Sequence, residues 1–352
     1  MHVILSRGFA GSERSTAESC NTQSREHTVA IVLRRSHASG SGASITKYLD
    51  PAVEVRTIPD LLFTRRALGR AIAEFRPDVI HTHLRRSTRL VSQLAPDCAT
   101  IATLHLSVNG PQFLDLDGLI CNAYWQQRDI PGDYSGQVFK LNNSLTPHRR
   151  LAAAEIAALR RDLGVADHEF LIGGVGRLAY SKGWDTLIRA FAAAKLKDAR
   201  LVILGEGRER ARLERLAGSQ GVLVGFRANV KDYYQAFDLF VCPSRREPLP
   251  RVILEAMDGG VAVIASTAEG CRELVTQYGG DLFPIEDEAA LTQLLVRHYQ
   301  SRGARPVVDL SAHHVDAVNK TIVDAYRSVI AHRRARIHGP LIERTSARPS
   351  GV

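Results

Sequence analysis

The chain has 352 residues, a formal net charge of +9 at pH 7 and a hydrophobic share of 45%. That length suits two domains of ordinary size, and the composition is that of a globular protein rather than a disordered one. No apolar run approaches the roughly 20 residues that cross a bilayer. The N-terminal apolar run at residues 3–5 is too short for the core of a signal peptide, so we expect it to form a first strand.

The cysteines are odd in number and scattered along the chain, with no C-x-x-C pair and no histidine at metal-ligand spacing. They are Cys20, Cys98, Cys121, Cys242 and Cys271. We expect reduced thiols, which are typical of a cytoplasmic protein.

Residues 60–90 are strongly basic, with seven arginines against three acids. The arginines are Arg65, Arg66, Arg70, Arg76, Arg85, Arg86 and Arg89. Such a patch suits an anionic partner such as phospholipid, a phosphorylated glycolipid or nucleic acid. Solvated helix faces are an equally open alternative.

Short apolar runs of strand type alternate with longer helical patterns, twice along the chain. The first series lies at residues 2–5, 28–33, 53–58, 78–83, 99–105 and 118–122, and the second at 171–176, 199–205, 221–226, 238–244 and 261–266. This alternation predicts parallel sheets flanked by helices. The fold class is therefore α/β, with two doubly wound domains.

The division into domains follows from a proline-marked turn and a helical pattern near residues 145–165. We expect an N-terminal domain at 1–148, a C-terminal domain at 149–312, a C-terminal helix at 313–335 that packs back on the N-terminal domain, and a mobile tail at 336–352. The last helix is indicated by Val318, Ile322, Ala325 and Val329, which share one helical face.

A loop with two cations follows the strand at 171–176. Gly174 and Gly176 permit close approach of a ligand to the backbone, and Arg177 and Lys182 could hold the two phosphates of a diphosphate. An ordinary strand-to-helix turn with exposed charges explains this loop equally well, because a lone G-x-G is weak.

The stretch "SRREPLPRVILEAM" carries two glutamates, Glu247 on a proline-rich loop and Glu255 inside a helix that begins near Arg251. The helix start would aim unpaired N–H groups at a phosphate beside Leu249, Arg251 and Val252. Glu255 could accept two hydrogen bonds from a ribose diol. Two surface acids would be the alternative, which fits poorly with a glutamate inside "VILEAM".

Several stretches carry a resemblance: "GGVGRLAYSKGWDTLIRAF", "LVILGEGRERARLERLA", "VGFRANV" and "SRREPLPRVILEAM". They resemble the donor half of retaining glycosyltransferases of the GT-B fold, family 4 (group 1). The resemblance implies that Arg177 and Lys182 bind the donor diphosphate, that Glu255 binds the ribose and that Glu247 contacts the transferred sugar. The match runs in order from about residue 172 to 275.

The first half of the chain agrees more loosely. Residues 9–14, "FAGSER", resemble the family's N-terminal loop, in which Gly11 meets the acceptor and the donor phosphates, and "TLHLS" places His105 where the family has a histidine close to the reacting sugar. His81 and His83 alternate on one face of a strand as two metal ligands do, but no third ligand is evident, so a structural role is favoured. Asp115 and Asp117 spell D-x-D, a short match that belongs to no diphosphate loop.

The resemblance implies a metal-independent hexosyltransferase that uses a nucleotide diphosphate sugar, with a UDP-sugar favoured. Arg177 and Lys182 would supply the positive charge that a metal provides elsewhere, and the acceptor would be presented by the N-terminal domain across the cleft. The "REPLPRV" variant is similar to members that build lipopolysaccharide core or other envelope glycans. A glycan or lipid-linked acceptor follows, with a cytoplasmic location, peripheral on the inner face of the membrane through the region from Arg65 to Arg89.

Two other classes stay open. A catalytically silent nucleotide-sugar-binding scaffold of the same fold would need Arg177 and Lys182 but not Glu247 or His105. A basic nucleic-acid binder would explain the charge, but the chain has no helix-turn-helix, zinc spacing or aromatic RNA-binding motif, so no nucleic-acid partner is expected.

Overall fold

The computed structural model describes residues 1–37, 44–218, 221–303 and 305–338. The chain divides into two compact units. The N-terminal unit comprises Met1–Cys121, Gln127–Leu141 and the segment that begins at Asn319, and the C-terminal unit comprises Asn122–Gln126 and Asn142–Val318. The division at Leu141 lies close to the boundary that the sequence placed at 148. Of the tail expected at 336–352, residues from 339 onward lie outside the described part.

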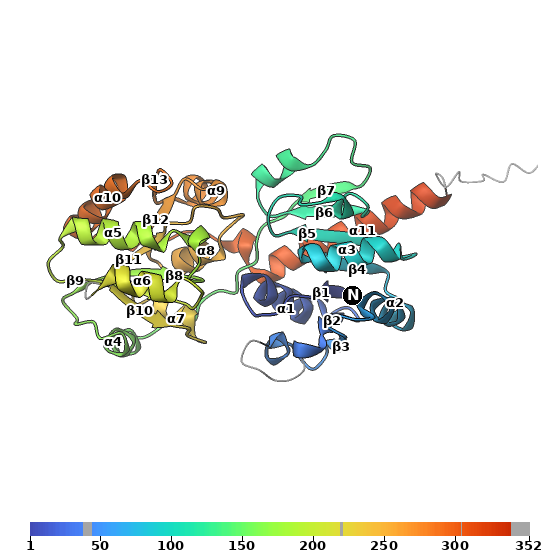
Figure 1. Ribbon diagram of the computed structural model, residues 1–352, viewed down its shortest axis with the longest axis horizontal. Helices are drawn as coiled ribbons and strands as arrows, with labels where there is room; N and C mark the ends of the chain where they lie inside the picture. Colours follow the sequence, from blue (N-terminus) through green and yellow to red (C-terminus); the bar gives the residue numbers. More distant parts are fainter. Residues whose placement is uncertain (38–43, 219–220, 304, 339–352) are drawn as a thin grey trace, which may run out of the picture. The chain divides into compact units, whose positions relative to one another are not determined.

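The N-terminal unit is built on a parallel seven-stranded sheet in the order β3-β2-β1-β4-β5-β6-β7 (Figure 1). Its strands are β1 His2–Ile4, β2 Ala30–Arg34, β3 Glu54–Ile58, β4 Val79–His83, β5 Ala99–Leu104, β6 Gly118–Cys121 and β7 Gln137–Lys140. Six of them coincide with apolar runs of the sequence. The edge strand β7 was not predicted, because it is short and only partly buried.

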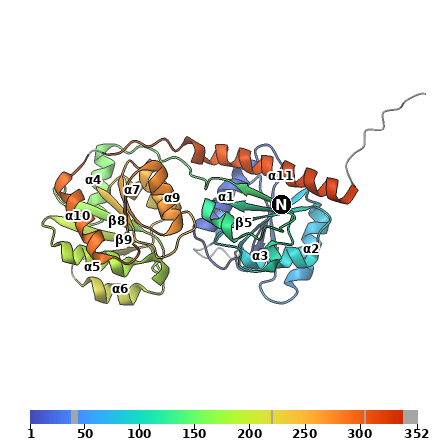
Figure 2. The same ribbon diagram turned by 90° about the horizontal axis from the view of Figure 1, so that it is seen from above.

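Helices cover both faces of this sheet. They are α1 Gly11–Gln23, α2 Thr64–Phe75, α3 Leu84–Leu94 and α11 Val315–His338. Figure 2 shows α11 along one face and α3 on the opposite side. On the α11 face, a Cβ added at Gly118 would lie 2.6 Å from Cγ1 of Val329, and Arg333 lies 3.0 Å from Asp117. By sequence, residues 9–14 resemble the family's N-terminal loop. The structure has a loop only up to Ala10, since α1 begins at Gly11.

The C-terminal unit has a parallel six-stranded sheet in the order β10-β9-β8-β11-β12-β13. Its strands are β8 Phe170–Val175, β9 Ala199–Leu204, β10 Gly221–Gly225, β11 Leu239–Cys242, β12 Ala262–Ser266 and β13 Asp281–Phe283. The three-residue edge strand β13 was not predicted. In the centre, β8 and β11 are neighbours, so the loops after them start side by side at the carboxyl edge.

Two apolar clusters hold the helices of this unit against its sheet. The helices are α4 Ala153–Asp162, α5 Trp184–Ala194, α6 Arg210–Ala217, α7 Val230–Tyr234, α8 Arg251–Asp258, α9 Glu269–Tyr278 and α10 Glu288–Ser301. One cluster joins α5, α6 and α10 to the sheet, and the other joins α4, α7, α8 and α9. Burial on both faces explains why the central strands read as continuous apolar runs.

Among the helices that the structure describes, none is both long enough and apolar enough to cross a membrane.

Replacing Gly183 with alanine should destabilise the C-terminal unit more than replacing Gly164. Both glycines have a left-handed backbone, with φ of +66° and +68°, so alanine costs each position about 1 kcal/mol or more. At Gly183 the added Cβ would also lie 2.0 Å from the carbonyl oxygen of Pro243, whereas at Gly164 it meets nothing within 4 Å. Urea unfolding followed by circular dichroism measures the difference, and equal losses would show that the Pro243 contact relaxes freely.

Candidate active site

Lys182 and Glu247 form an ion pair at the carboxyl edge of the C-terminal sheet. The Nζ of Lys182 donates to Oε2 of Glu247 at 2.5 Å, and the two side chains are only 18% and 12% exposed. Burial by itself would lower the pKa of Lys182, but the charge of Glu247 raises it above its ordinary value. The sequence therefore selected two residues from separate loops that the structure brings into contact.

Arg245 ties the two loops together. Its backbone N–H donates to the carbonyl of Ser181 at 2.9 Å, and its guanidinium donates to the carbonyl of Tyr180 at 2.7 Å and to Asp185 at 2.9 Å. The guanidinium also lies 4.1 Å from the ring centre of Tyr180. These contacts fix the short helix that ends at Lys182 against the segment that leads to Glu247.

The loop that carries Glu247 is held from behind by backbone contacts. Gly270 donates to the carbonyl of Glu247 at 3.2 Å, and Nε1 of Trp125 donates to the carbonyl of Pro248 at 2.9 Å. A Cβ at Gly270 would lie 2.0 Å from that Pro248 carbonyl, so only glycine allows this approach. Asn143 donates to the carbonyl of Leu249 at 3.1 Å.

Helix α8 starts at Arg251, as the sequence predicted, with Pro250 as its N-cap. Glu255 lies one turn further and is 4% exposed. Its carboxylate accepts from the hydroxyl of the buried Tyr234 at 2.9 Å, and Arg251 lies 3.9 Å away. Glu255 is therefore no surface acid. Val252, on the same first turn, is half-buried.

Arg177 follows β8 and its side chain is exposed. Its carbonyl accepts from Nε1 of Trp184 at 2.8 Å. The ring of Trp184 also fills the space beside Gly174, where an added Cβ would lie 2.7 Å from it. Packing against Trp184 thus explains why residue 174 is a glycine. From the sequence, this glycine had been assigned to close approach of a ligand.

Gly11 and His105 both belong to the N-terminal unit. A Cβ at Gly11 would meet nothing within 4 Å, so packing within this unit does not demand a glycine there. Burial lowers the pKa of His105 to about 4, although the nearby Glu13 opposes this shift. The imidazole is therefore neutral at pH 7, and its buried Nε2 has no hydrogen-bond partner among the described residues.

Three further histidines lie together in the same unit. His2, His81 and His83 are buried, and one ring nitrogen of each lies within 4.8 Å of the others. His2 on β1 is the third member that the sequence did not reveal, because only the pairing of β1 with β4 brings it beside the other two. Burial lowers the pKa of His2 to about 3 and those of His81 and His83 well below the usual value.

Asp117 of the D-x-D stretch has a structural role. It is buried and accepts from the backbone N–H of Thr100 at 2.9 Å. It also pairs with Arg333 of α11 at 3.0 Å. Asp115 accepts from Ser92, so the two carboxylates serve different contacts.

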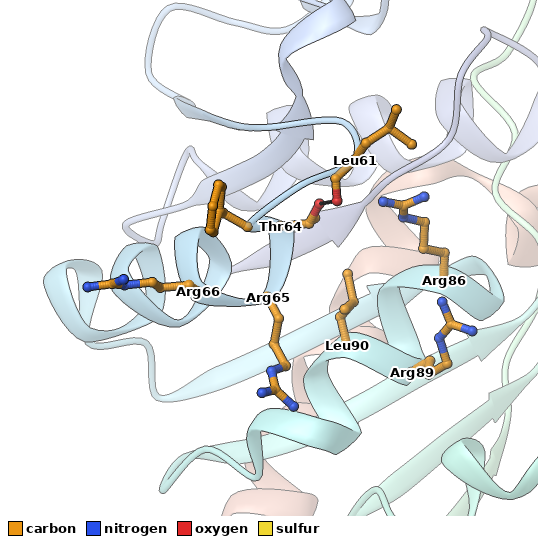
Figure 3. Close-up of a pocket in the computed structure, with 8 residues that line it drawn as sticks. Leu61, Thr64, Arg65, Arg66, Arg86, Arg89 and Leu90 are labelled. Atoms are coloured by element: carbon orange, nitrogen blue, oxygen red, sulfur yellow. Dashed lines mark hydrogen bonds between the residues drawn. The ribbon is translucent and has the colours of Figure 1, made fainter.

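The basic region of the N-terminal unit lines a pocket of 470 Å³ between α2 and α3. Figure 3 shows Arg65 and Arg66 on α2 and Arg86 and Arg89 on α3 around it. The loop before α2 adds an apolar tip of Leu61, Leu62 and Phe63, which are 71%, 75% and 74% exposed. None of the described residues that line the pocket is acidic.

Comparison with known proteins identifies the fold. The crystal structure of the Anabaena protein HepE in complex with UDP-glucose matches 96% of this chain and 98% of that chain, with a TM-score of 0.73 at 18% identity. The two doubly wound units are thus the GT-B fold of glycosyltransferases, and the predicted fold class is confirmed.

Within that fold, residues 169–301 match the family model "Glycosyl transferases group 1". The chain therefore carries a group 1 glycosyl transferase domain, as the resemblance implied. An uncharacterised glycosyltransferase of Methanocaldococcus jannaschii is 40% identical over 124 residues, which are 33% of this chain and 32% of that protein. The lipopolysaccharide core biosynthesis glycosyltransferase LpsD of Rhizobium meliloti is 28% identical over 222 residues, 59% of this chain and 61% of that protein. The chain thus spans about a third to three fifths of these relatives' lengths.

A double-mutant cycle should reveal strong coupling between Lys182 and Glu247. Lys182→Met and Glu247→Gln should each destabilise by about 1–3 kcal/mol, because each leaves a mostly buried partner unpaired. The double variant should lose less than the sum of the two. Urea unfolding of the four proteins measures the coupling.

The pair of Arg210 and Glu214, which is 2.8 Å apart with side chains 35% and 50% exposed, is the more exposed control for this cycle. Arg210→Met with Glu214→Gln should show coupling of only about 0.5 kcal/mol or less. Additive losses at Lys182 and Glu247 would show that the two side chains do not pair in solution.

Proposed function

We propose that the protein is a retaining glycosyltransferase that moves a sugar from a nucleotide diphosphate sugar to a glycan or glycolipid acceptor. The observation that carries the proposal is the Lys182–Glu247 pair beside the start of α8, inside a group 1 glycosyl transferase domain. The carboxyl edge of an open parallel sheet is where such folds bind ligands. A UDP-sugar is the favoured donor, because HepE was solved with UDP-glucose.

The donor diphosphate would be held by Arg177, Lys182 and the first backbone N–H groups of α8. Leu249, Arg251 and Val252 surround that helix start, where N–H groups and the helix dipole favour negative charge. Arg177 is exposed and so can turn to a ligand. These groups would stabilise the charge that develops on the departing nucleotide diphosphate, so the proposal assigns no role to a metal ion.

The two glutamates would recognise hydroxyl groups. Glu255 would accept hydrogen bonds from the ribose diol with one oxygen, while Tyr234 holds the other oxygen at 2.9 Å. A donor phosphate near Lys182 would compete with Glu247 for its charge. Glu247 would then accept from hydroxyls of the transferred sugar, and we assign it that positioning role rather than that of a covalent nucleophile.

The acceptor would meet the N-terminal unit at Gly11, and His105 would lie close to the transferred sugar. The open space at Gly11 leaves room for a ligand, and neutral His105 can hydrogen-bond a sugar hydroxyl without adding charge. The name of LpsD, a lipopolysaccharide core glycosyltransferase, supports an envelope glycan such as lipopolysaccharide core as the acceptor class.

A lipid-linked acceptor would place the protein at the inner face of the cytoplasmic membrane. The apolar tip at Leu61, Leu62 and Phe63 and the arginines around it suit an anionic bilayer. Apolar side chains enter the headgroup region while arginines meet lipid phosphates. This combination supports peripheral binding through the region from Arg65 to Arg89.

Nucleotide sugars should stabilise the purified protein without added metal. We expect one of UDP-glucose, GDP-mannose and ADP-glucose to raise the melting temperature, by about 2–4 °C for each kcal/mol of binding linkage. Glu255→Gln should lose most of the shift. Slow hydrolysis of the same donor, followed by NMR, should first release the sugar with the anomeric configuration it had in the donor.

Glu214→Gln, which removes an exposed carboxylate on α6, is the matched control and should keep the full shift. A donor shift that survives in Glu255→Gln would contradict the ribose assignment. A shift without any hydrolysis or transfer would favour the silent scaffold instead.

Vesicles that contain about a third phosphatidylglycerol in phosphatidylcholine should bind the protein at low salt, and pure phosphatidylcholine should not. Replacing Arg65 and Arg66 with glutamine should weaken binding by about 2 kcal/mol, or roughly thirtyfold. Leu62→Ser with Phe63→Ser should weaken it further at high salt, where insertion rather than charge dominates. Flotation in a density gradient measures the bound fraction.

The control for these variants is Arg208→Gln with Arg215→Gln, which removes two exposed arginines from the C-terminal unit. It should bind vesicles like the unchanged protein. Equal weakening in both arginine variants would mean that net charge, and not this surface, drives the association.

A further inference from the structure

His2 and His83 share a head-on hydrogen bond. Nδ1 of His2 lies 3.1 Å from Nε2 of His83, and the two rings are 9° from parallel with centres 5.4 Å apart. Because a ring nitrogen lies about 1.2 Å from its ring centre, a straight N–H···N bond of this length places the centres about 5.4 Å apart.

The direction of this bond is fixed from the C-terminal helix. The amide nitrogen of Gln23 donates to Oδ1 of Asn319 on α11 at 2.9 Å, so its amide oxygen faces His2. That oxygen only accepts, hence Nε2 of His2 carries the proton of their 2.9 Å contact. Neutral His2 is then an acceptor at Nδ1, and His83 must donate from Nε2.

One ring nitrogen of His83 has no partner at the end of this series of hydrogen bonds. Neutral His83 with its proton on Nε2 has a lone pair on Nδ1, which is buried and has no partner among the described residues. Nε2 of His105 is also buried and has no partner among the described residues, and the two ring centres are 5.7 Å apart. An acceptor left unpaired in the interior loses its hydration with nothing to compensate for it.

Both histidines lie at the edge of the sheet where ligands bind. His83 is the last residue of β4, His105 directly follows the neighbouring β5, and the two strands are parallel. A hydroxyl group is the chemical match to two neutral imidazoles, because it donates one hydrogen bond and accepts another. A phosphate or carboxylate would offer no proton to the lone pair of His83.

We propose that His83, together with His105, binds a hydroxyl group of the transferred sugar through Nδ1. His2 and Gln23 are positioning residues that fix the proton of His83 on Nε2. The sugar as the source of this hydroxyl rests on the proposed function, whereas the proton arrangement does not. His81 takes no part in this series of hydrogen bonds. Both its ring nitrogens lie 2.7 Å from hydroxyl groups, those of Tyr326 and Thr103.

The proton arrangement is tested by long-range ¹H–¹⁵N NMR on tag-free, full-length protein with ¹⁵N-labelled histidine. His2 and His83 should both be neutral and protonated at Nε2. Gln23→Leu should mix the two tautomers of His83, and Gln23→Glu should restore the single form because a carboxylate also accepts. A His83 proton on Nδ1, or a His83 tautomer that stays unchanged in Gln23→Leu, would refute the proposed proton arrangement.

The hydroxyl is tested by adding UDP-glucose, GDP-mannose or ADP-glucose, each against its nucleoside diphosphate alone. The Nδ1 resonance of His83 should move with the nucleotide sugar that stabilises the protein and not with the free nucleotide. If a nucleotide sugar stabilises the protein while this resonance stays fixed, water is the occupant and the sugar contact is refuted, although the donor site stands. Uptake of one equivalent of Zn²⁺, lost in His83→Gln, would replace the hydrogen-bonded chain with a metal site.

Discussion

The mutual neutralisation of Lys182 and Glu247 is the interaction on which the C-terminal unit's carboxyl edge depends. Two charges that are mostly withdrawn from water need each other, so the loops after β8 and β11 must meet. Arg245 holds the loops together from one side, and Gly183 and Gly270 let backbone pass where a side chain would collide. In the proposed function, a donor phosphate would take over Lys182 and release Glu247 to accept hydrogen bonds from other groups.

The N-terminal unit buries neutral imidazole rings instead of an ion pair. The buried His2, His83 and His105 stay neutral. Hydrogen bonds that run from Asn319 through Gln23 and His2 decide which nitrogen of His83 carries a proton. A neutral site suits the uncharged part of a nucleotide sugar, whereas cations and helix N–H groups suit its phosphates. The two units thus differ in chemistry, with charged groups in one and neutral imidazoles in the other.

Much of this could be predicted from the sequence, for physical reasons. Central strands are buried on both faces and read as apolar runs, which predicted the sheets, and the spacing around Lys182, Glu247 and Glu255 selected residues that the structure places at one sheet edge. The edge strands β7 and β13 are too short or too exposed to leave such a run. Tyr234, Trp125 and His2 were not singled out from the sequence. Their contacts join distant parts of the chain, which only the tertiary fold brings together.

The membership of α11 in the N-terminal unit has a consequence for synthesis on the ribosome. Residues 142–318 of the C-terminal unit form one continuous stretch and leave the ribosome before the last helix. The N-terminal sheet, although made first, lacks Tyr326 against His81 and Val329 against Gly118 until residues 319–338 have emerged. We therefore expect the order of folding to reverse the order of translation, with the first-made half waiting longest in a state that chaperones recognise.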